Sequence, residues 1–190
     1  MGVCVNGRKI YLAGPEVFLP DAVDVGLRKK SLCQEFGFVG LYPLDTETPE
    51  GAGRDQRIYA ANLALIGQAD AAIFNLSPFR GLGADPGAAF ELGYVAALGK
   101  PAFAYSNDPA DLFDRVAESL GAHPTPQGGW CDAHGFEIEK FGNADNLMLD
   151  CALKASGQTV LRAETKLPLG DLTLFTACLR KALLKFGTLK

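Results

Sequence analysis

The sequence predicts one α/β domain over residues 1–190, with a doubly wound sheet of about five parallel strands flanked by helices. Short apolar runs alternate with longer segments of helical periodicity, which is typical of repeated βαβ units. Two strand-like runs lead through turns of small residues into helices, as strands do at the ligand-binding edge of flavodoxin-like and Rossmann-like sheets. No repeat, low-complexity tract or linker divides the chain.

The first half of the chain predicts three strands and two helices. A turn at Ala13-Gly14-Pro15 has neither the G-x-G-x-x-G fingerprint nor the G-K-[ST] of a phosphate loop. Apolar residues recur at helical spacing from Asp21 to Gly37. Residues 44–55 are polar and rich in Gly, Pro and Thr, which predicts a loop before a helix at Arg57–Gly67. The predicted strands are Lys9–Leu12, Val39–Tyr42 and Ala71–Leu76.

The second half continues the alternation, with one irregular interruption. Residues 121–143 contain glycine-bearing turns and the single Trp of the chain, which predicts a loop excursion from the core. Strands are predicted at Pro101–Tyr105 and Thr159–Leu161. Helices are predicted at Pro86–Gly99, Asp111–Leu120, Leu147–Leu153 and Leu172–Phe186.

Composition and charge exclude several classes of function. A net charge of −4 and a pI near 5.2 disfavour a nucleic-acid partner, which calls for a basic face. No apolar run approaches the roughly 20 residues of a membrane span, and MGVCVNGRK lacks the apolar core of a signal peptide. An odd number of scattered cysteines, five in all, favours reduced thiols in a cytoplasmic protein. Cys131 and His134 have ligand spacing but no second pair, so no metal is predicted.

The stretch NLSPFRGLGADPGAAFELG, at Asn75–Gly93, contains the first candidate for a reacting group. Asp85 and Pro86 are favoured at the start of a helix. Glu91 is the one charged residue from Pro86 to Gly99, so its carboxylate needs a partner or a cavity. Small residues three and four positions before it, Ala88 and Gly87, leave room for a ligand. The residues expected to bury much of this helix are Phe90, Leu92, Val95 and Leu98.

Two candidate motifs converge on one crevice. Ligands of doubly wound sheets bind outside the carboxyl ends of the strands. The first strand brings Tyr11 and the Gly14 turn to that edge, and the third brings the helix with Glu91. Asp70 precedes the third strand and is expected at the opposite edge as a turn or cap residue.

These segments resemble the nucleoside 2-deoxyribosyltransferase family. The resemblance implies an enzyme without a cofactor that acts on N-glycosidic bonds in nucleotide salvage and moves a 2-deoxyribosyl group between nucleobases. In the family the Glu of FELG, here Glu91, attacks the anomeric carbon and forms a covalent intermediate, with net retention, as in retaining glycosidases. The matching segments are KIYLAGPEVF at Lys9–Phe18, RDQRIYAANLALIGQADAAIFNLSPFRG at Arg54–Gly81, DPGAAFELGYVAALGKP at Asp85–Pro101 and NLML at Asn146–Leu149.

The resemblance also implies roles for neighbouring residues, each with a structural alternative. Tyr11 corresponds to the tyrosine that holds the nucleophile, or it is a core residue. Asp85 corresponds to an aspartate that contacts substrate and moves protons, or it is only a helix cap. Asn62 lies where some members have an aspartate proposed to protonate the leaving base. Because an amide is no general acid, that role falls to Asp85 or water. Phe18 stacks on the base or packs in the core.

Other implied roles concern partners. Asn146 and Met148 match residues that reach into the site of a neighbouring subunit, the Asn holding the sugar 5-hydroxyl. This implies a homo-oligomer with a shared active site, whose substrates are deoxyribonucleosides and free nucleobases. Arg80 binds an anion or pairs with a loop acid.

Two alternative functions stay open at this point. A hydrolase of the same superfamily would cleave deoxynucleosides or their 5-phosphates with water. Glu16 in the first turn is expected to repel a phosphate, which favours a free 5-hydroxyl. A non-catalytic sensor of nucleotide derivatives is disfavoured by the presence of both Tyr11 and Glu91. The choice between purines and pyrimidines is not specified by Asn62, which both donates and accepts hydrogen bonds.

Overall fold

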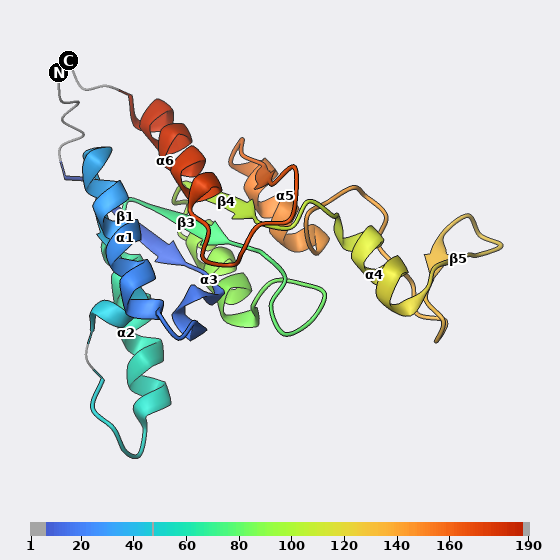
Figure 1. Cartoon of the computed structure of the whole chain (residues 1–190), viewed down its shortest axis with the longest axis horizontal. Helices are drawn as coiled ribbons and strands as arrows, with labels where there is room; N and C mark the ends of the chain where they lie inside the picture. The colour runs from blue at the N-terminus through green and yellow to red at the C-terminus, as the bar shows by residue number, and fades with distance from the viewer. Residues whose placement is uncertain (1–6, 47, 188–190) are drawn as a thin grey trace.

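The computed structural model describes residues 7–46 and 48–187, and its centre is a five-stranded sheet (Figure 1). The strand order is β2-β1-β3-β4-β7, and every neighbouring pair is parallel. This is the order of flavodoxin-like sheets, which bind ligands between the first and third strands. The predicted α/β fold is therefore confirmed. The strands are β1 (Lys9–Ala13), β2 (Val39–Leu41), β3 (Ala71–Asn75), β4 (Ala102–Ser106) and β7 (Val160–Arg162).

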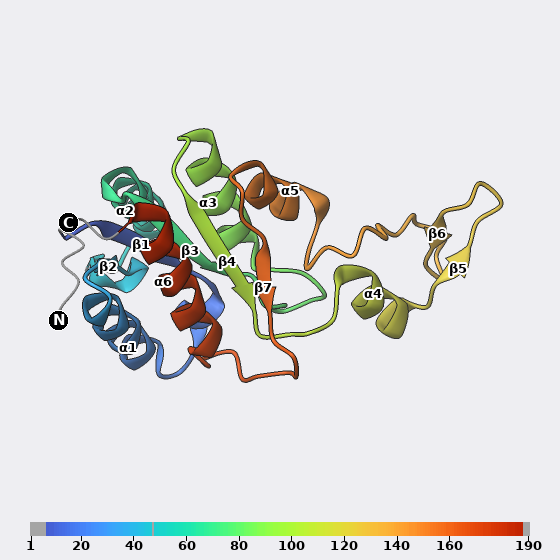
Figure 2. The same ribbon diagram turned by 90° about the horizontal axis from the view of Figure 1, so that it is seen from above.

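Helices cover both faces of this sheet (Figure 2). Side chains alternate along each strand, so Ile10 and Leu12 of β1 pack with α1 and α6. Tyr11 and Ala13 face the opposite layer, formed by α2, α3 and α5. The helices are α1 (Ala22–Glu35), α2 (Arg54–Gln68), α3 (Pro86–Ala97), α4 (Leu112–Leu120), α5 (Leu147–Ala155) and α6 (Thr173–Phe186).

The α-helices and the five strands of the sheet lie close to where the sequence predicts them, and two single-turn helices were missed. Two single-turn helices, η1 (Pro15–Phe18) and η2 (Pro43–Asp45), each begin at a proline. Helix α2 begins at Arg54, earlier than predicted. Gly53 precedes it with a φ of 73°, a left-handed conformation that glycine adopts without strain. Asp70 accepts a hydrogen bond from the Lys9 amide, at the amino edge of the sheet as expected.

The expectation that Phe90 and Leu98 are buried is wrong. Helix α3 packs on the sheet through Ala88, Leu92 and Val95, whereas Phe90 and Leu98 are 53% and 44% exposed. A single face of the helix meets the sheet, so apolar residues on its other side stay at the surface. The Phe90 ring lies there between two tyrosines, Tyr59 and Tyr94.

Residues 121–143 extend away from the sheet beyond α4 (Figures 1 and 2). They contain a short antiparallel pair, β5 (His123–Pro124) and β6 (Trp130–Cys131), which the sequence did not predict. The Trp130 ring meets Phe113 of α4 edge to face, and the ammonium of Lys140 lies 4.0 Å from the Trp130 ring centre. These contacts fasten the extension to α4.

Among the described residues, no helix has the length and apolar character to cross a bilayer. Cys4 and the rest of the segment compared with signal peptides lie largely outside the described residues. The other four cysteines are free thiols. Burial raises the pKa of Cys33 and of Cys178 to about 12, which keeps both thiols protonated and unreactive.

Candidate active site

Helix α3 brings Glu91 to the carboxyl edge of the sheet, beside the ends of the paired strands β1 and β3. The helix starts as predicted, because the Asp85 carboxylate accepts a hydrogen bond of 3.1 Å from the Ala88 amide and Pro86 takes the first helical position. Glu91 lies on the face of α3 that looks toward α2. Tyr11 approaches it from β1, on the same side of the sheet.

One oxygen of the Glu91 carboxylate receives two hydrogen bonds. The Tyr11 hydroxyl donates to Oε1 at 2.7 Å, and Nδ2 of Asn62 on α2 donates to the same atom at 3.1 Å. Oε2 has no hydrogen-bond partner among the described residues. The carboxylate is therefore fixed by one oxygen while the other is available to a ligand.

The ionisation of Glu91 is shifted toward neutral pH. The pKa of Glu91 is raised from 4.5 to about 7. Burial is the main cause and the charge of Asp85 adds to it, whereas the hydrogen bonds from Tyr11 and Asn62 lower the pKa. Burial and the neighbouring carboxylate also raise the pKa of Tyr11, so its hydroxyl stays protonated and acts as a donor. A buried acid that titrates near neutral pH is typical of an active site.

A cavity of about 270 Å³ opens beside the free oxygen of Glu91. It contains four further predicted residues, Gly14, Phe18, Asn62 and Asp85, whereas Tyr11 lies beneath it and is fully buried. The other lining residues are Val17, Pro43, Leu44, Thr46, Thr48, Arg54, Ile58, Ala61, Gly87 and Ala88.

Comparison with known proteins identifies the family. Residues 10–148 match the family model for nucleoside 2-deoxyribosyltransferase. The chain belongs to this family. It is 36% identical to a 2-desoxiribosyltransferase from Leishmania mexicana, whose structure superposes with a TM-score of 0.58 over 75% of this chain and 85% of that one.

Two further similarities concern proteins whose names state no activity. An uncharacterised protein of Schizosaccharomyces pombe, C191.05c, is 32% identical, with 78% of each chain covered. A protein from Enterococcus faecalis V583 is 18% identical, with a TM-score of 0.55 over 93% of this chain and 99% of that one. The latter similarity concerns the fold alone.

Gly14 lines the cavity, and close packing requires a glycine at this position. Its φ is 150°, and a side chain there would collide with the Glu16 carboxylate and approach Asn75 Cβ to 2.7 Å. The absence of a side chain lets the first turn cross the ends of β1 and β3 directly beside the cavity.

The expectation that Glu16 repels an anion at the site is wrong. Its side chain is fully buried on the other side of the sheet and forms an ion pair of 2.6 Å with Lys29. The same oxygen accepts hydrogen bonds from the Tyr105 hydroxyl and from Nδ2 of the Asn75 side chain. Lys29 balances the charge of Glu16 inside the protein, so Glu16 does not disfavour a substrate that carries a phosphate.

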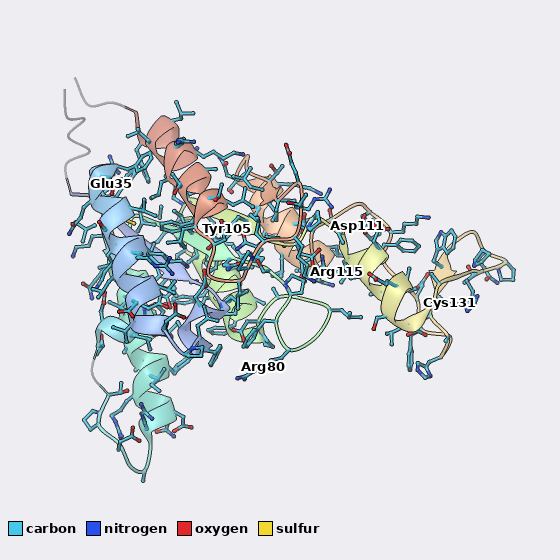
Figure 3. All side chains as sticks on the ribbon, in the orientation of Figure 1. Glu35, Arg80, Tyr105, Asp111, Arg115 and Cys131 are labelled. Atoms are coloured by element: carbon cyan, nitrogen blue, oxygen red, sulfur yellow. The ribbon has the colours of Figure 1, made fainter. Side chains whose placement is uncertain are left out.

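Phe18 and Arg80 form one wall of the site. The half-exposed Phe18 ring faces the cavity and stacks on Phe79 at 5.3 Å between ring centres. Figure 3 shows Arg80 on the loop between β3 and α3, and its guanidinium lies within 5 Å of both rings. It joins no ion pair in the described part of the chain, so the expected pairing with a loop acid is not formed.

Asn146 and Met148 lie outside the cavity of their own chain. Asn146 caps α5 by accepting a bond from the Met148 amide, and its Nδ2 donates to Glu139 at 2.7 Å. Met148 is 70% exposed. That both residues contribute to the site of a neighbouring subunit therefore stays a prediction. To bind the sugar there, Asn146 must give up its hydrogen bond to Glu139.

Two features of the site were not predicted from the sequence. One is the end of the cavity near Arg54, and the other is a set of hydrogen bonds from Arg115, called the clamp below. Arg54, Ile58 and Asn62 follow each other at intervals of four on α2, a signal that was present in the sequence. No pattern in the sequence predicts the clamp. Arg115 of α4 donates to the carbonyls of Leu82 and Ala144, and so joins the loop before α3 to the start of α5.

No group of three or more His, Cys, Asp or Glu in the described residues is arranged to hold a metal ion. Figure 3 shows Cys131 on the extension, away from the sheet that contains Tyr105. The spacing of Cys131 and His134 is explained by a turn, in which the Asp132 carboxylate accepts hydrogen bonds from the His134 and Phe136 amides.

Proposed function

We propose that this protein transfers a 2-deoxyribosyl group from one nucleobase to another through a covalent intermediate on Glu91. The proposal depends on one observation above all. Glu91 is held by one oxygen, while the other is free beside a cavity at the ligand-binding edge of the sheet. The 36% identity to the Leishmania 2-desoxiribosyltransferase supports the reaction class.

In the first step, the free oxygen of Glu91 attacks C1 of the sugar on the face opposite the base. A C–O bond forms, the bond from C1 to the base nitrogen breaks, and its electron pair leaves with the base, which takes up a proton. A nitrogen of a second base then attacks C1 and loses its proton. The new C–N bond forms with the electron pair of that nitrogen, the C–O bond to Glu91 breaks, and its electron pair returns to the carboxylate. Two inversions give net retention.

Tyr11 and Asn62 act as positioning residues for this nucleophile, and Asp85 is proposed to exchange the proton with the base. Asp85 lines the cavity with Glu91 and also caps α3, so the two roles are compatible. A 2-deoxy sugar lacks the electron-withdrawing 2-hydroxyl, so positive charge develops readily at C1. The carboxylate of Glu91 stabilises that charge.

The proposed substrates are deoxyribonucleosides and free nucleobases, in cytoplasmic nucleotide salvage. The apolar wall of Val17, Phe18, Leu44 and Ile58 suits a flat base and limits water near the intermediate. Free thiols at the four described cysteines agree with a reducing compartment.

We further propose a homo-oligomer in which Asn146 and Met148 of one subunit complete the site of another. Met148 projects from the start of α5 and is 70% exposed, as expected for a residue that contacts a second chain. The exposed aromatic residues of α2 and α3 lie next to the cavity and provide an apolar surface for such a contact.

Incubation with deoxyinosine, with and without adenine, tests the reaction class. We expect deoxyadenosine and hypoxanthine to form only when adenine is present. Free deoxyribose that forms equally fast in both reactions would instead identify a hydrolase. Binding of deoxyinosine without any product would identify a sensor.

The variant Glu91→Ala tests the nucleophile. We expect base exchange to fall by several orders of magnitude while the protein stays folded. Glu35→Ala is the matched control, because Glu35 is an exposed glutamate at the end of α1, remote from the cavity (Figure 3). Wild-type exchange by Glu91→Ala would remove this residue from the mechanism.

A further inference from the structure

The walls of the cavity differ in chemistry. The start of α3 lines it with the carboxylates of Asp85 and Glu91, which serve the reacting bond as proposed above. An apolar end lies between η1, η2 and α2, where Phe18, Leu44 and Ile58 provide apolar walls. A base bound between these walls directs the edge remote from its glycosidic nitrogen away from Glu91.

Arg54 lies at the outer limit of this apolar end. It occupies the same face of α2 as Ile58 and Asn62, at intervals of four residues. Eight residues of helix span about 12 Å, so Arg54 is two turns away from the residue that contacts Glu91. It is the one Arg or Lys among the described residues that line this cavity.

Among the described residues, one exchangeable contact holds the Arg54 guanidinium. Its partner is Glu50 at 2.9 Å, a residue whose side chain is 81% exposed, and Arg54 itself is 47% exposed. Exposed ion pairs of this kind contribute little stability and reorganise readily. Arg57 differs, because its guanidinium donates to the carbonyls of Pro49 and Ala52 and so holds the loop. Arg54 is therefore free to turn toward a ligand.

An arginine side chain has five N–H donors and no acceptor. A 6-oxopurine presents two acceptors, O6 and N7, on its Hoogsteen edge, with O6 pointing away from the sugar, and arginine binds that pair in a bidentate manner. A 6-aminopurine presents a donor in place of O6, which opposes the guanidinium. Thr46 and Thr48 also line this end, but a hydroxyl donates or accepts and so does not discriminate.

We propose that Arg54 selects bases with a carbonyl at this edge, so that 6-oxopurines such as hypoxanthine and guanine are preferred over 6-aminopurines such as adenine. This inference rests on the proposed transfer reaction and adds its base specificity. A bidentate contact of this kind discriminates about 5- to 150-fold between bases.

A competition between two incoming bases tests the inference. The protein is given deoxyguanosine as donor with equal concentrations of hypoxanthine and adenine, and the initial rates of deoxyinosine and deoxyadenosine formation are measured. Both bases compete for the same intermediate, so the ratio of the products reports base selection. The sum of the products reports whether transfer occurs at all.

We expect deoxyinosine to exceed deoxyadenosine with the wild-type protein, and Arg54→Gln to lower this ratio by about 5- to 150-fold. Glutamine pairs with adenine N6 and N7, so this variant favours adenine. The control Glu50→Gln removes the partner of Arg54 outside the cavity and should leave the ratio at or above the wild-type value. Arg54 begins α2 and is half-exposed, so we expect the variant to fold, and a thermal melt checks this.

An unchanged ratio in Arg54→Gln, or an excess of deoxyadenosine with the wild-type protein, would overturn the role of Arg54. If neither product forms, the proposed function fails instead. Calorimetric affinities of hypoxanthine and adenine for the same proteins then decide the inference alone: a preference for hypoxanthine lost in Arg54→Gln supports it, and equal affinities refute it.

Discussion

The Glu91 carboxylate is the group whose protonation state controls the proposed reaction. Only the ionised form attacks the sugar, and its pKa is raised to about 7 chiefly by burial. We therefore expect kcat/KM to rise about tenfold per pH unit below pH 7 and to level off above it. Initial rates of exchange between deoxyinosine and adenine from pH 5 to 9 check this. A flat profile between pH 5 and 7 would contradict it.

The hydrogen bond from Tyr11 opposes that rise in the pKa of Glu91. Tyr11→Phe removes the bond, so the pKa of Glu91 moves further upward and the acid limb shifts to higher pH. A lost bond to a charged group corresponds to a decrease of about 10- to 100-fold in kcat/KM near pH 7. We expect a smaller loss at pH 9, where more of the Glu91 in the variant is ionised. Tyr59→Phe, at an exposed tyrosine, should leave the profile unchanged.

The raised pKa also predicts how stability depends on pH. The pKa of Glu91 is higher in the folded protein than in the unfolded chain. The folded protein therefore loses stability as pH rises between the two values, here from 4.5 to about 7. Glu91→Gln keeps an oxygen for Tyr11 and removes this loss. We expect the variant to be more stable by about 3 kcal/mol at pH 8 and by roughly 1 kcal/mol at pH 5. Urea unfolding at both pH values measures the difference; a gain of equal size at both would exclude ionisation as its cause.

At the scale of the elements, the start of α3 depends on a clamp formed by Arg115. Its guanidinium donates to the carbonyls of Leu82, Ala110 and Ala144 at 2.6–2.7 Å and lies 3.5 Å from the Asp145 carboxylate. Asp145 in turn accepts from the Ala84 amide. The loop that leads into Asp85 is therefore fixed by buried polar contacts.

Arg115→Met leaves these carbonyls and the Asp145 carboxylate without their partner. We expect a loss of about 3–5 kcal/mol in the free energy of unfolding, since breaking a buried pair leaves an uncompensated charge. Urea titration measures it. Arg28→Met is the control, because Arg28 pairs with Asp21 at 4.0 Å on the surface and should change stability by under about 0.5 kcal/mol. A similar effect of both variants would show that the clamp contributes nothing specific.

The sequence predicts the features that depend on neighbouring residues in the chain better than those that depend on contacts between distant residues. Strand β3 and the start of α3 follow from local apolar runs and from Asp85-Pro86, and both lie where predicted. The direction of the Glu16 side chain depends on Lys29 and Tyr105, which are distant in the sequence, and the prediction for it was wrong.

The same distinction holds for the site. Glu91 is recognisable as a lone acid on an apolar helix, and Tyr11 as the end of a strand that meets it. The cavity beyond them depends on where η2 and the following loop lie, and no local pattern indicates that. The sequence could have predicted Arg54 as a site residue, because its spacing from Asn62 places both on one helical face.

At the scale of the whole molecule, two sets of exposed apolar residues bear on the proposed oligomer. Tyr59 and Phe90 project from α2 and α3 beside the cavity, with 55% and 53% of their areas exposed. Phe136, Phe141 and Met148 project from the extension and from the start of α5, each at least 67% exposed. Large apolar side chains exposed in this way are typical of contacts between chains. In the proposed oligomer, the extension of one subunit would lie at the cavity of the other.

Complementation between two inactive variants tests whether the active site is shared. Glu91→Ala removes the nucleophile, and Asn146→Ser shortens the side chain proposed to reach the neighbouring substrate while it keeps a capping oxygen for α5. In a mixed dimer, one site combines an intact Glu91 with an intact Asn146 from the other chain. Random mixing across a two-fold interface therefore restores about one quarter of the wild-type rate. Each variant alone, refolded in the same way, is the control. A mixture no more active than the sum of its parts would place Glu91 and Asn146 in separate functions.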